Sequence, residues 1–432
     1  MHGRGAERGE SVHDLKIGSR GVSNDDAHAN SFDNDTPVCQ GRTPPPKRLF
    51  HLLNRLANVR SDLPGLQPGS VLLHIGVHKT GTTAVQSALM TCRPFLDTWN
   101  VRYPGITRAQ HKIAVAGANR SLGWKDRGAF APQPKKWKKF LREAREYDGI
   151  TVLSSEFLAE SNIDVITNMI NDLGSDRVHV VVTMRNLAKI MPSAWQQFLK
   201  GGYTFGYEEW LRNILTAPKR DANAKLFWAR HQHDEVVQRW SSVVGADQMS
   251  VIVVDESVRE GIFWEFEDML GLPKNTLVDH QGTESNRSMT IAETEFLRKI
   301  NADVAPEMQW PEYRMLIRRG LIKGMVETRT PEPDEPKLLT PQWALDRAAE
   351  ISGPMCGAIE ASGVHIRGNM DVLRAHLNGP EHVVIDDSTP LPVAAVVAGL
   401  AGVVRVIENE LDRETKSKLT KAWEKASRSI KR

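Results

Sequence analysis

The stretch that most constrains the fold of this 432-residue chain is GVHKTGTT, from Gly76 to Thr83. It follows an apolar run, Val71–Ile75, and precedes Ala84–Met90, which has the composition of a helix. A strand, a glycine-containing turn and a helix form the layout of a phosphate-binding loop, whose backbone N–H groups and helix dipole attract an anion. A P-loop NTPase has lysine after the second glycine. Here that position is Thr82, and the lysine is Lys79, so the loop predicts an anion site of a different kind.

Short apolar runs elsewhere predict a buried parallel sheet. These runs are nearly continuous and not alternating, which is typical of strands covered on both faces. Strands that alternate with helical segments indicate an α/β doubly wound core, with ligands at the carboxyl ends of the strands. The expected strands are Val71–Val77, Ile150–Ser154, Val178–Met184 and Met249–Val254. The expected helices of this part are Thr82–Arg93, Pro134–Tyr147, Asp164–Leu173, Leu187–Lys200, Tyr207–Leu215 and Leu226–Val243.

The chain from about residue 290 onward is expected to be largely helical. The predicted segments are Ile291–Asn301, Glu312–Gly324, Pro341–Ser362, Met370–Leu377 and Val393–Arg432. We expect a linker-like extension over residues 1–67, an α/β domain with its helical part over 68–378, and a helical extension over 379–432. The apolar run Pro392–Val404 is too short to span a membrane and ends at Arg405, so we expect it to form a buried helix.

Composition argues against several classes of protein. Lys and Arg total 56 against 53 Asp and Glu, which does not suggest a nucleic-acid binder. The cysteines, Cys39, Cys92 and Cys356, show no paired spacing, so a reducing cytoplasm is the preferred location. No apolar signal sequence opens the chain. Lys47–Arg60 is basic and amphipathic; we expect it to dock on the main domain, with a membrane-surface contact as the alternative.

The HKTGTT motif resembles the 5′-phosphosulfate loop of sulfotransferases that use 3′-phosphoadenosine 5′-phosphosulfate (PAPS), usually PKxGTT. His78 stands where that family has proline. The resemblance implies that Lys79 contacts the oxygen bridging sulfate and phosphate. It also implies that Gly81, Thr82 and Thr83 hold the 5′-phosphate. The donor-binding residues implied in this way are His78, Lys79, Thr80, Gly81, Thr82, Thr83, Arg185 and Ser193.

A second part of the resemblance lies in VHVVVTMRNLAKIMPSAWQQFLKGG. Arg185 follows a buried strand and Ser193 comes eight residues later on the next helix, the family's spacing for the 3′-phosphate site. A guanidinium can grip a phosphate with paired hydrogen bonds. Trp195, Gln196 and Gln197 are candidates to shape the adenine or acceptor side. Three further segments, ITVLSSEFL among them, resemble a bacterial branch of the family, so the resemblance runs from about residue 71 to 373.

Transfer of a sulfuryl group to a hydroxyl or amine is an in-line displacement that needs a base but, by this resemblance, no metal. The first candidate base is Glu156, just past the strand Ile150–Ser154, and the second is His111 at the start of a helix. His78 is a third, whereas His231 and His233 are more consistent with structural roles. The acceptor stays open among a glycan, a glycolipid and a small metabolite, and no acceptor pocket or oligomeric state can be read from the sequence.

Two other classes of function remain open. VIVVDE, Val251–Glu256, imitates the Walker B strand of a P-loop kinase or NTPase, although the lysine after Gly81 is missing. A non-catalytic nucleotide-binding protein with the same fold is the other alternative. The basic segment Tyr313–Gly324 is expected to be the solvated face of a helix, with a lid over an anionic ligand as the alternative. The C-terminal R-K-G loop of the cytosolic members of the family is not evident.

Overall fold

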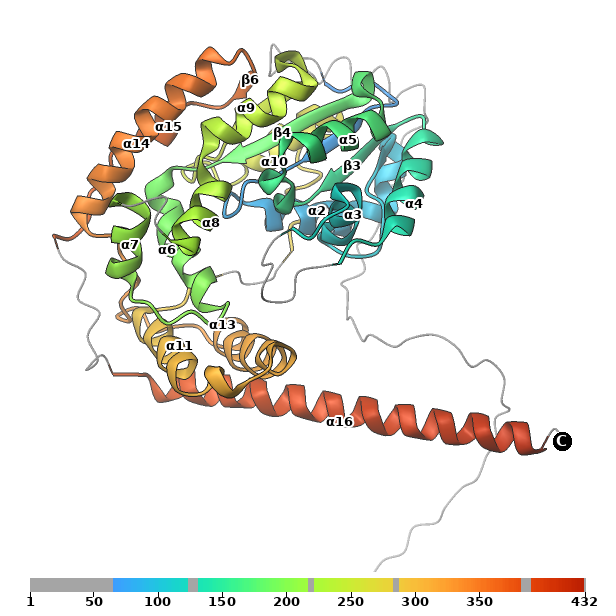
Figure 1. The fold of residues 1–432 in the computed structure, drawn as a ribbon, viewed down its shortest axis with the longest axis vertical. Coiled ribbons are helices and arrows are strands. Elements are labelled where there is room, and N and C mark those ends of the chain that lie inside the picture. The colour runs from blue at the N-terminus through green and yellow to red at the C-terminus, as the bar shows by residue number, and fades with distance from the viewer. Residues whose placement is uncertain (1–64, 123–130, 217–220, 283–286, 382–389, 431–432) are drawn as a thin grey trace, which may run out of the picture. The chain divides into compact units, whose positions relative to one another are not determined.

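The computed structural model describes residues 65–122, 131–216, 221–282, 287–381 and 390–430. Within these ranges the strands form a six-stranded parallel sheet in the order β2-β3-β1-β4-β5-β6 (Figure 1). This confirms the expected α/β fold with a parallel sheet. The strands are β1 (Val71–His74), β2 (Val101–Arg102), β3 (Ile150–Ser154), β4 (Val178–Met184), β5 (Met249–Val253) and β6 (His365–Arg367).

Strand β1 lies at the point where the strand order changes direction. The chain leaves β1 for the edge strand β2 and returns to β3 on one side of β1, and then continues through β4, β5 and β6 on the other side. Ligands of open α/β sheets bind beyond the carboxyl ends of the strands at such a switch point. The loop after β1, Gly76–Thr83, occupies this position, so the topology predicts that a ligand binds there.

Helices cover both faces of the sheet. Leu72 of β1 packs with α2 and α10 on one face, whereas Leu73 packs with α3, α4, α5 and α9 on the other. Both leucines are fully buried, as expected for a sheet with two covered faces. These helices are α2 (Thr82–Leu96), α3 (His111–Ala118), α4 (Pro134–Arg145), α5 (Ile163–Leu173), α9 (His233–Val244) and α10 (Gly261–Leu270). Short 3₁₀ turns are η1 (Asp97–Trp99), η2 (Glu156–Glu160), η3 (Ser175–Arg177) and η4 (Ala246–Gln248).

A second hydrophobic core joins the helices outside the sheet. Trp195 of α6 and Trp210 of α7 lie fully buried in it, together with Met325 of α13. The helices are α6 (Leu187–Leu199), α7 (Tyr207–Thr216), α8 (Ala222–His231), α11 (Ile291–Asp303), α12 (Trp310–Tyr313), the π-helix η6 (Arg314–Ile322), α13 (Lys323–Thr328) and α14 (Gln342–Ala361). Shorter pieces are η5 (Ala305–Glu307) and α15 (Asp371–Arg374), and α16 (Val393–Ile430) is the last helix. The expected helical C-terminal part is therefore present.

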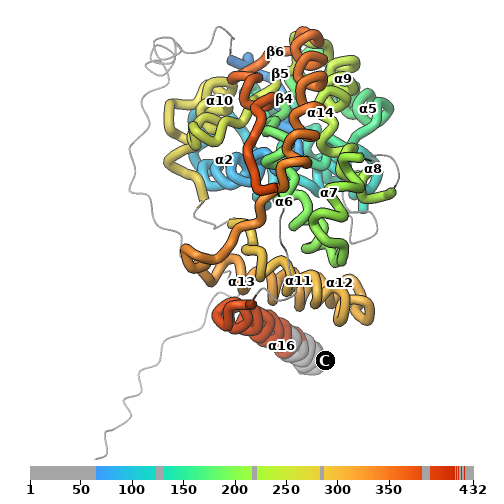
Figure 2. Tube along the Cα trace, turned by 90° about the vertical axis from the view of Figure 1, so that its left-hand side faces the viewer, coloured from blue at the N-terminus to red at the C-terminus, as the bar shows by residue number. Residues whose placement is uncertain are grey.

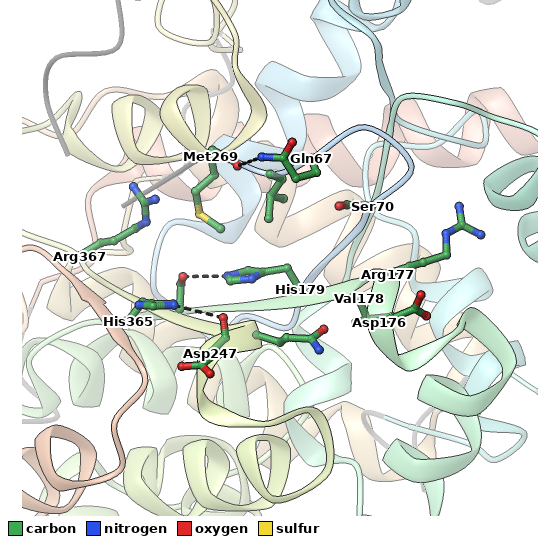
Figure 3. Close-up of a pocket in the computed structure, with 14 residues that line it drawn as sticks. Gln67, Ser70, Asp176, Arg177, Val178, His179, Asp247, Met269, His365 and Arg367 are labelled. Atoms are coloured by element: carbon green, nitrogen blue, oxygen red, sulfur yellow. Dashed lines mark hydrogen bonds between the residues drawn. The ribbon is translucent and has the colours of Figure 1, made fainter. Parts of the chain in front are cut away.

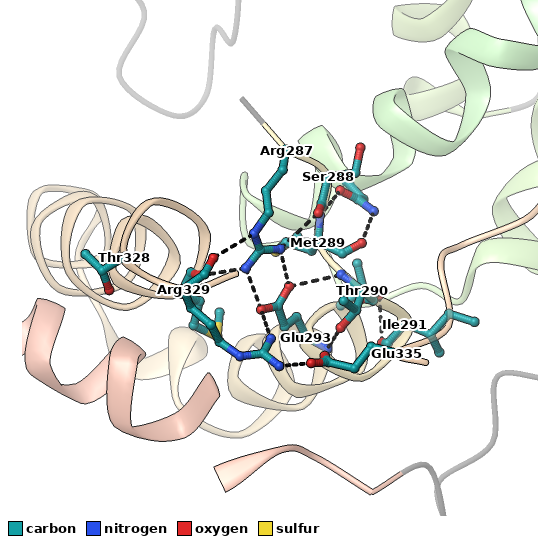
Figure 4. A network of polar contacts seen from close by, with 12 residues as sticks. Arg287, Ser288, Met289, Thr290, Ile291, Glu293, Thr328, Arg329 and Glu335 are labelled. Carbon is teal, nitrogen blue, oxygen red and sulfur yellow. Dashed lines mark hydrogen bonds and ion pairs between the residues drawn. The ribbon is translucent and has the colours of Figure 1, made fainter. Parts of the chain in front are cut away.

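A buried ion-pair network ties α11 to α13 (Figure 4). The fully buried carboxylate of Glu293 accepts two hydrogen bonds from Arg287, at 2.7 and 2.8 Å, and one from Arg329 at 2.7 Å. It also accepts the backbone N–H of Thr290, which completes a capping box at the start of α11. Arg287 donates further to the carbonyl of Met325. Because a buried charge is costly unless it is paired, this network fixes how the two helices meet.

Several of the expected elements differ from the prediction in their bounds or helix type; the helix expected over Met370–Leu377, for example, covers only Asp371–Arg374. The strand predicted over Val71–Val77 ends at His74, because Gly76 has φ 89° and leaves the extended conformation. The helix predicted over Leu226–Val243 is two helices, α8 and α9. Gln232 breaks them with a non-helical ψ of 81° while its amide donates to Asp234 in the first turn of α9. The helix predicted over Glu312–Gly324 is largely a π-helix.

The apolar run at the start of α16 corrects another expectation. Val393 and Leu400 are exposed, so the Pro392–Val404 segment is not a buried helix. Only one side of α16 packs on the protein, where Gly402 lies against Gly320. No helix in the described ranges has the length and apolar character needed to cross a bilayer. Residues 1–64, which include the amphipathic segment Lys47–Arg60 and Cys39, lie outside the described residues.

Candidate functional site

The loop after β1 has a backbone that requires its glycines. Gly76 and Gly81 have φ of 89° and 87°, in the left-handed region that favours glycine. A Cβ on Gly76 would lie 2.7 Å from the Cβ of Glu156, and one on Gly81 would lie 2.9 Å from Ile262. Lys79 also has a positive φ, 66°. The loop therefore packs directly against the start of η2, and α2 begins immediately after Gly81.

Two threonines of the loop, Thr80 and Thr82, form hydrogen bonds within the fold, whereas Thr83 lies in the first turn of α2. The hydroxyl of Thr80 is fully buried, donates to the carbonyl of Val77 at 2.8 Å and contacts Thr183 of β4 at 2.6 Å. Thr82 donates to the same carbonyl at 3.3 Å. Thr80 and Thr82 thus use their hydroxyls to hold the turn together. The backbone N–H groups of the first turn of α2, which includes Thr83, have no acceptor one turn earlier in the helix, as at any helix start.

The protonation of Lys79 depends on its surroundings in the folded protein. Its ammonium group donates to the side-chain oxygen of Gln197 of α6 at 3.2 Å. Burial, and then the positive charge of Lys200, lower the pKa of Lys79 to about 7, with Glu156 opposing the shift. An anion bound at the loop would restore the charged form. Lys79 is thus a cation whose charge depends on what occupies the site.

Arg185 meets the loop from the end of β4. Its Nη1 donates to the carbonyl of Lys79 at 3.5 Å, and its Nη2 forms an ion pair with Glu256. The same carboxylate pairs with Lys189 at 3.0 Å. The Nε of Arg185 is buried and has no hydrogen-bond partner among the described residues. A buried donor without a partner is costly, and an anion at this point would satisfy it.

Ser193 lies on α6, eight residues after Arg185. It is partly buried, and its hydroxyl donates to the carbonyl of Ile190 in the same helix at 2.9 Å. The structure therefore brings Arg185 to the loop directly, whereas the hydroxyl of Ser193 bonds to its own helix.

Two candidate bases are neighbours. Glu156 opens η2, and its Oε1 lies 3.8 Å from Nε2 of His111, which opens α3. Gln86 of α2 donates to the other carboxylate oxygen at 3.3 Å. His111 also contacts the hydroxyl of Ser155 through Nδ1 at 2.8 Å, and its ring stacks on Phe157 at 4.2 Å. The sequence predicted both residues but not that they form a pair.

The pKa values of His111 and Glu156 are both lowered, but for different reasons. Burial lowers the pKa of His111, against the nearby charge of Glu156, so the imidazole is neutral at pH 7. Burial raises the pKa of Glu156, but His111, His78 and the amide of Gln86 outweigh that effect and the net pKa is lowered. A neutral imidazole beside a carboxylate is an arrangement that can accept a proton.

The side chain of His78 points into a buried ion-pair cluster that the sequence did not predict. Its Nε2 lies 3.2 Å from Glu160, which also accepts from Nε of Arg230 at 2.8 Å. The ring of His231 lies 6.5 Å from that of His78. His231 and His233 are both buried, as their expected structural roles require. Glu160 and Arg230 come from η2 and α8, and only the fold brings them to the loop.

A separate cavity of about 350 Å³ lies at the opposite edge of the sheet (Figure 3). It is lined by the amino-terminal ends of β4, β5 and β6. There His179 contacts Ser250 at 2.8 Å, and His365 contacts the carbonyl of Asp247 at 3.1 Å. The candidate residues of the sequence analysis do not line this cavity. The candidate site is therefore the carboxyl-end cluster around Lys79, where the topology expects a ligand.

Comparisons with known proteins are sparse. No protein-family model matches the chain, and no curated protein matches it. Among solved structures, the chain is similar to one described as a sulfotransferase from Alicyclobacillus acidocaldarius. The identity is 14% and the TM-score is 0.37, over 59% of this chain and 100% of that chain. These values are too low to identify a family, so the functional argument rests on the site itself.

Proposed function

We propose that this protein is a sulfotransferase that moves a sulfuryl group from PAPS to a hydroxyl or amine of an acceptor. The observation that carries the proposal is the contact of Arg185 with the carbonyl of Lys79. It joins the two halves of the sequence motif, about 100 residues apart, into one cluster of cations at the sheet switch point. PAPS has a phosphosulfate at its 5′ position and a separate phosphate at its 3′ position. The loop would bind the first of these groups and Arg185 the second.

The residues of the site suit this donor. PAPS supplies the sulfuryl group. The start of α2 and Lys79 would hold the 5′ end, where Lys79 can offset negative charge that develops on a leaving oxygen. Arg185, with its buried Nε and the nearby Lys189, would hold the 3′-phosphate after release from Glu256. Gln197, which binds Lys79, is a further candidate to align this end of the donor.

The acceptor would lose its proton to the pair formed by Glu156 and His111. The acceptor oxygen or nitrogen forms a bond to sulfur as the bond from sulfur to the bridging oxygen breaks. The bond's electron pair leaves with adenosine 3′,5′-bisphosphate. Glu156 remains our first choice for the base, and His111 its partner. We do not assign the acceptor beyond a glycan, a glycolipid or a small metabolite.

The kinase alternative has less support. Asp255, the residue that would correspond to a Walker B aspartate, accepts the N–H and hydroxyl of Ser257 in its own turn, at 2.9 and 2.7 Å. Glu256 pairs with Arg185 and Lys189. These acids therefore interact with cations and a local turn. The two described cysteines, Cys92 and Cys356, are buried. A cytoplasmic location is part of the same proposal.

Calorimetry with adenosine 3′,5′-bisphosphate tests the proposal. The Arg185→Ala variant should lose roughly tenfold or more in affinity for this ligand, the usual cost of a lost charged contact. Its affinity for adenosine 5′-phosphate, which lacks the 3′ group, should change little. Arg177→Ala, which removes an arginine at the far edge of the sheet, is the control. Equal losses for both ligands would reject Arg185 as the 3′-phosphate clamp.

A further inference from the structure

Helix α16 exposes an apolar stripe. Six of its side chains are between 41% and 76% exposed although they are Val, Leu or Ile. They follow one another at intervals of four, three, four, three and four residues, which places them on one side of the helix. They are Val393, Val397, Leu400, Val404, Ile407 and Leu411. Monomeric proteins seldom expose a contiguous apolar surface of this kind without a function.

The opposite side of α16 is fixed to the protein, as Figures 1 and 2 show by its place along the helices around α13. A Cβ on Gly402 would lie 2.3 Å from the carbonyl oxygen of Gly320, and one on Gly324 would lie 2.3 Å from that of Ala398. The helix backbones therefore touch through small residues. Because this contact sets the rotation of α16, the helix is unable to turn its apolar stripe toward its own domain.

The part of α16 beyond the stripe is basic, whereas Glu408, Glu410 and Asp412 lie along the last turns of the stripe itself. From Arg413 to Arg432 the sequence has eight Lys and Arg against two Glu. Exposed Arg314 and Arg319 of η6 and Lys323 of α13 lie on the helices that carry α16. Trp423, farther along α16, is 75% exposed. Apolar side chains with a tryptophan, next to a cationic segment, are the combination found in helices that lie on anionic membranes.

We propose that α16 binds in the plane of a bilayer that contains anionic lipid. Its apolar stripe would enter the boundary between headgroups and acyl chains, while the basic segment would stay among the headgroups. Val393 to Val404 includes no charged or polar residue, and Ala394 and Ala401 extend the exposed stripe sideways. A parallel pair of copies is disfavoured, because it would bring two strongly positive ends together; the experiment below tests pairing of copies in either direction. This surface is independent of the proposed sulfuryl transfer.

Vesicle flotation of the full chain tests the proposal. The protein should float with vesicles of equal parts phosphatidylcholine and phosphatidylglycerol, and much less with phosphatidylcholine alone. High salt should reduce the bound fraction because it screens the cationic segment. The Val397→Asp/Leu400→Asp variant should lose roughly tenfold or more of its binding. Ile106→Asp/Ile163→Asp changes two exposed apolar residues elsewhere and should bind as the unaltered chain does.

Three results would overturn the proposal. One is an unaltered chain that fails to float, or floats equally with neutral vesicles. Another is binding that survives Val397→Asp/Leu400→Asp while circular dichroism shows the variant folded. The third is a dimer in analytical ultracentrifugation that the same variant dissociates, which would assign the stripe to a second copy of the chain. Since both positions are exposed, neither substitution should disturb the core.

Discussion

At the scale of single residues, the charge of Lys79 links the site to pH. Its pKa is about 7 without a ligand, and a bound anion favours the protonated form. Below about pH 7 the ammonium is already charged. As pH rises above that value, binding an anion must also bind a proton, so affinity falls. The affinity for adenosine 3′,5′-bisphosphate should therefore decrease roughly tenfold per pH unit above the pKa, until the pKa of the complex is reached.

Calorimetry from about pH 6 to about pH 9 checks this dependence. Lys79→Ala should bind more weakly and lose most of the slope, which separates the lysine from other titrating groups. A slope that is unchanged in Lys79→Ala would assign the effect to another residue. A flat profile for the unaltered chain would contradict a lowered pKa at this position.

The neighbouring pair Glu156 and His111 makes a second prediction at this scale. Because the two side chains lie 3.8 Å apart, they should act as a unit in proton transfer. Glu156→Gln and His111→Ala should each reduce turnover of labelled PAPS with cell extract as acceptor by roughly 10²–10⁴-fold. The double variant should be little worse than the poorer single variant, since such effects are non-additive. Losses that multiply would show that the two residues act independently.

At the scale of elements, the conformation of the loop should matter as much as its side chains. Gly81 has φ 87°, and a Cβ there would lie 2.9 Å from Ile262. Gly81→Ala should therefore strain the loop by about 1–2 kcal/mol and weaken binding of adenosine 3′,5′-bisphosphate. Gly206→Ala is the matched control, because a Cβ there meets nothing within 4 Å and its φ is ordinary. Equal affinity in both variants would contradict the assignment of this loop as the anion site.

The sequence predicted the central elements of the fold better than its edges. Strands β3 and β4 have the expected bounds because their apolar runs are long and continuous. The edge strands β2 and β6 escaped prediction, since two or three residues carry no periodic signal. The break at Gln232 between α8 and α9 was missed because it falls in a polar stretch, Arg230–Glu235, that has no glycine or proline to mark a helix end. The exposed side of α16 was missed because hydropathy alone does not say which side of a helix is covered.

The sequence predicted those residues of the candidate site that belong to local motifs, but not the contacts that helix packing creates. Lys79 and Arg185 belong to local motifs that a strand and a turn position. Glu160 comes from η2, and nothing in its local sequence marks it. Gln197 of α6 was a candidate to shape the adenine or acceptor side, but its contact with Lys79 was not predicted. Their contacts with His78 and Lys79 depend on how distant helices pack, which no local pattern encodes.

At the scale of the whole molecule, buried neutral histidines should make the fold sensitive to acid. Burial lowers the pKa of His74 and of His233 to about 4, and lowers that of His231 well below its ordinary value. The unfolded chain titrates near pH 6.5. Between that pH and about 4 the unfolded state binds more protons, so stability is present above pH 6.5 and is lost as pH falls. His74 alone accounts for on the order of 3 kcal/mol.

Urea unfolding at about pH 7.5 and about pH 5 measures this loss. The free energy of unfolding should be lower at the acidic pH, and His74→Gln should show a smaller difference between the two conditions. The hydrogen bond of His74 to Ser154 means that the variant will also be less stable overall, so the comparison uses the difference between pH values. Equal differences in the two proteins would contradict a depressed pKa for His74.

The central claim is that the site holds a donor with one 5′ phosphate-like group and a 3′ anchor, and calorimetry of the full chain with two nucleotides tests it most directly. Adenosine 3′,5′-bisphosphate should bind in the presence of a chelator, because the cations of the site are Lys79 and Arg185. ATP should bind more weakly, with or without Mg²⁺. Tight binding of ATP that requires Mg²⁺, together with no binding of adenosine 3′,5′-bisphosphate, would contradict the account and favour a kinase.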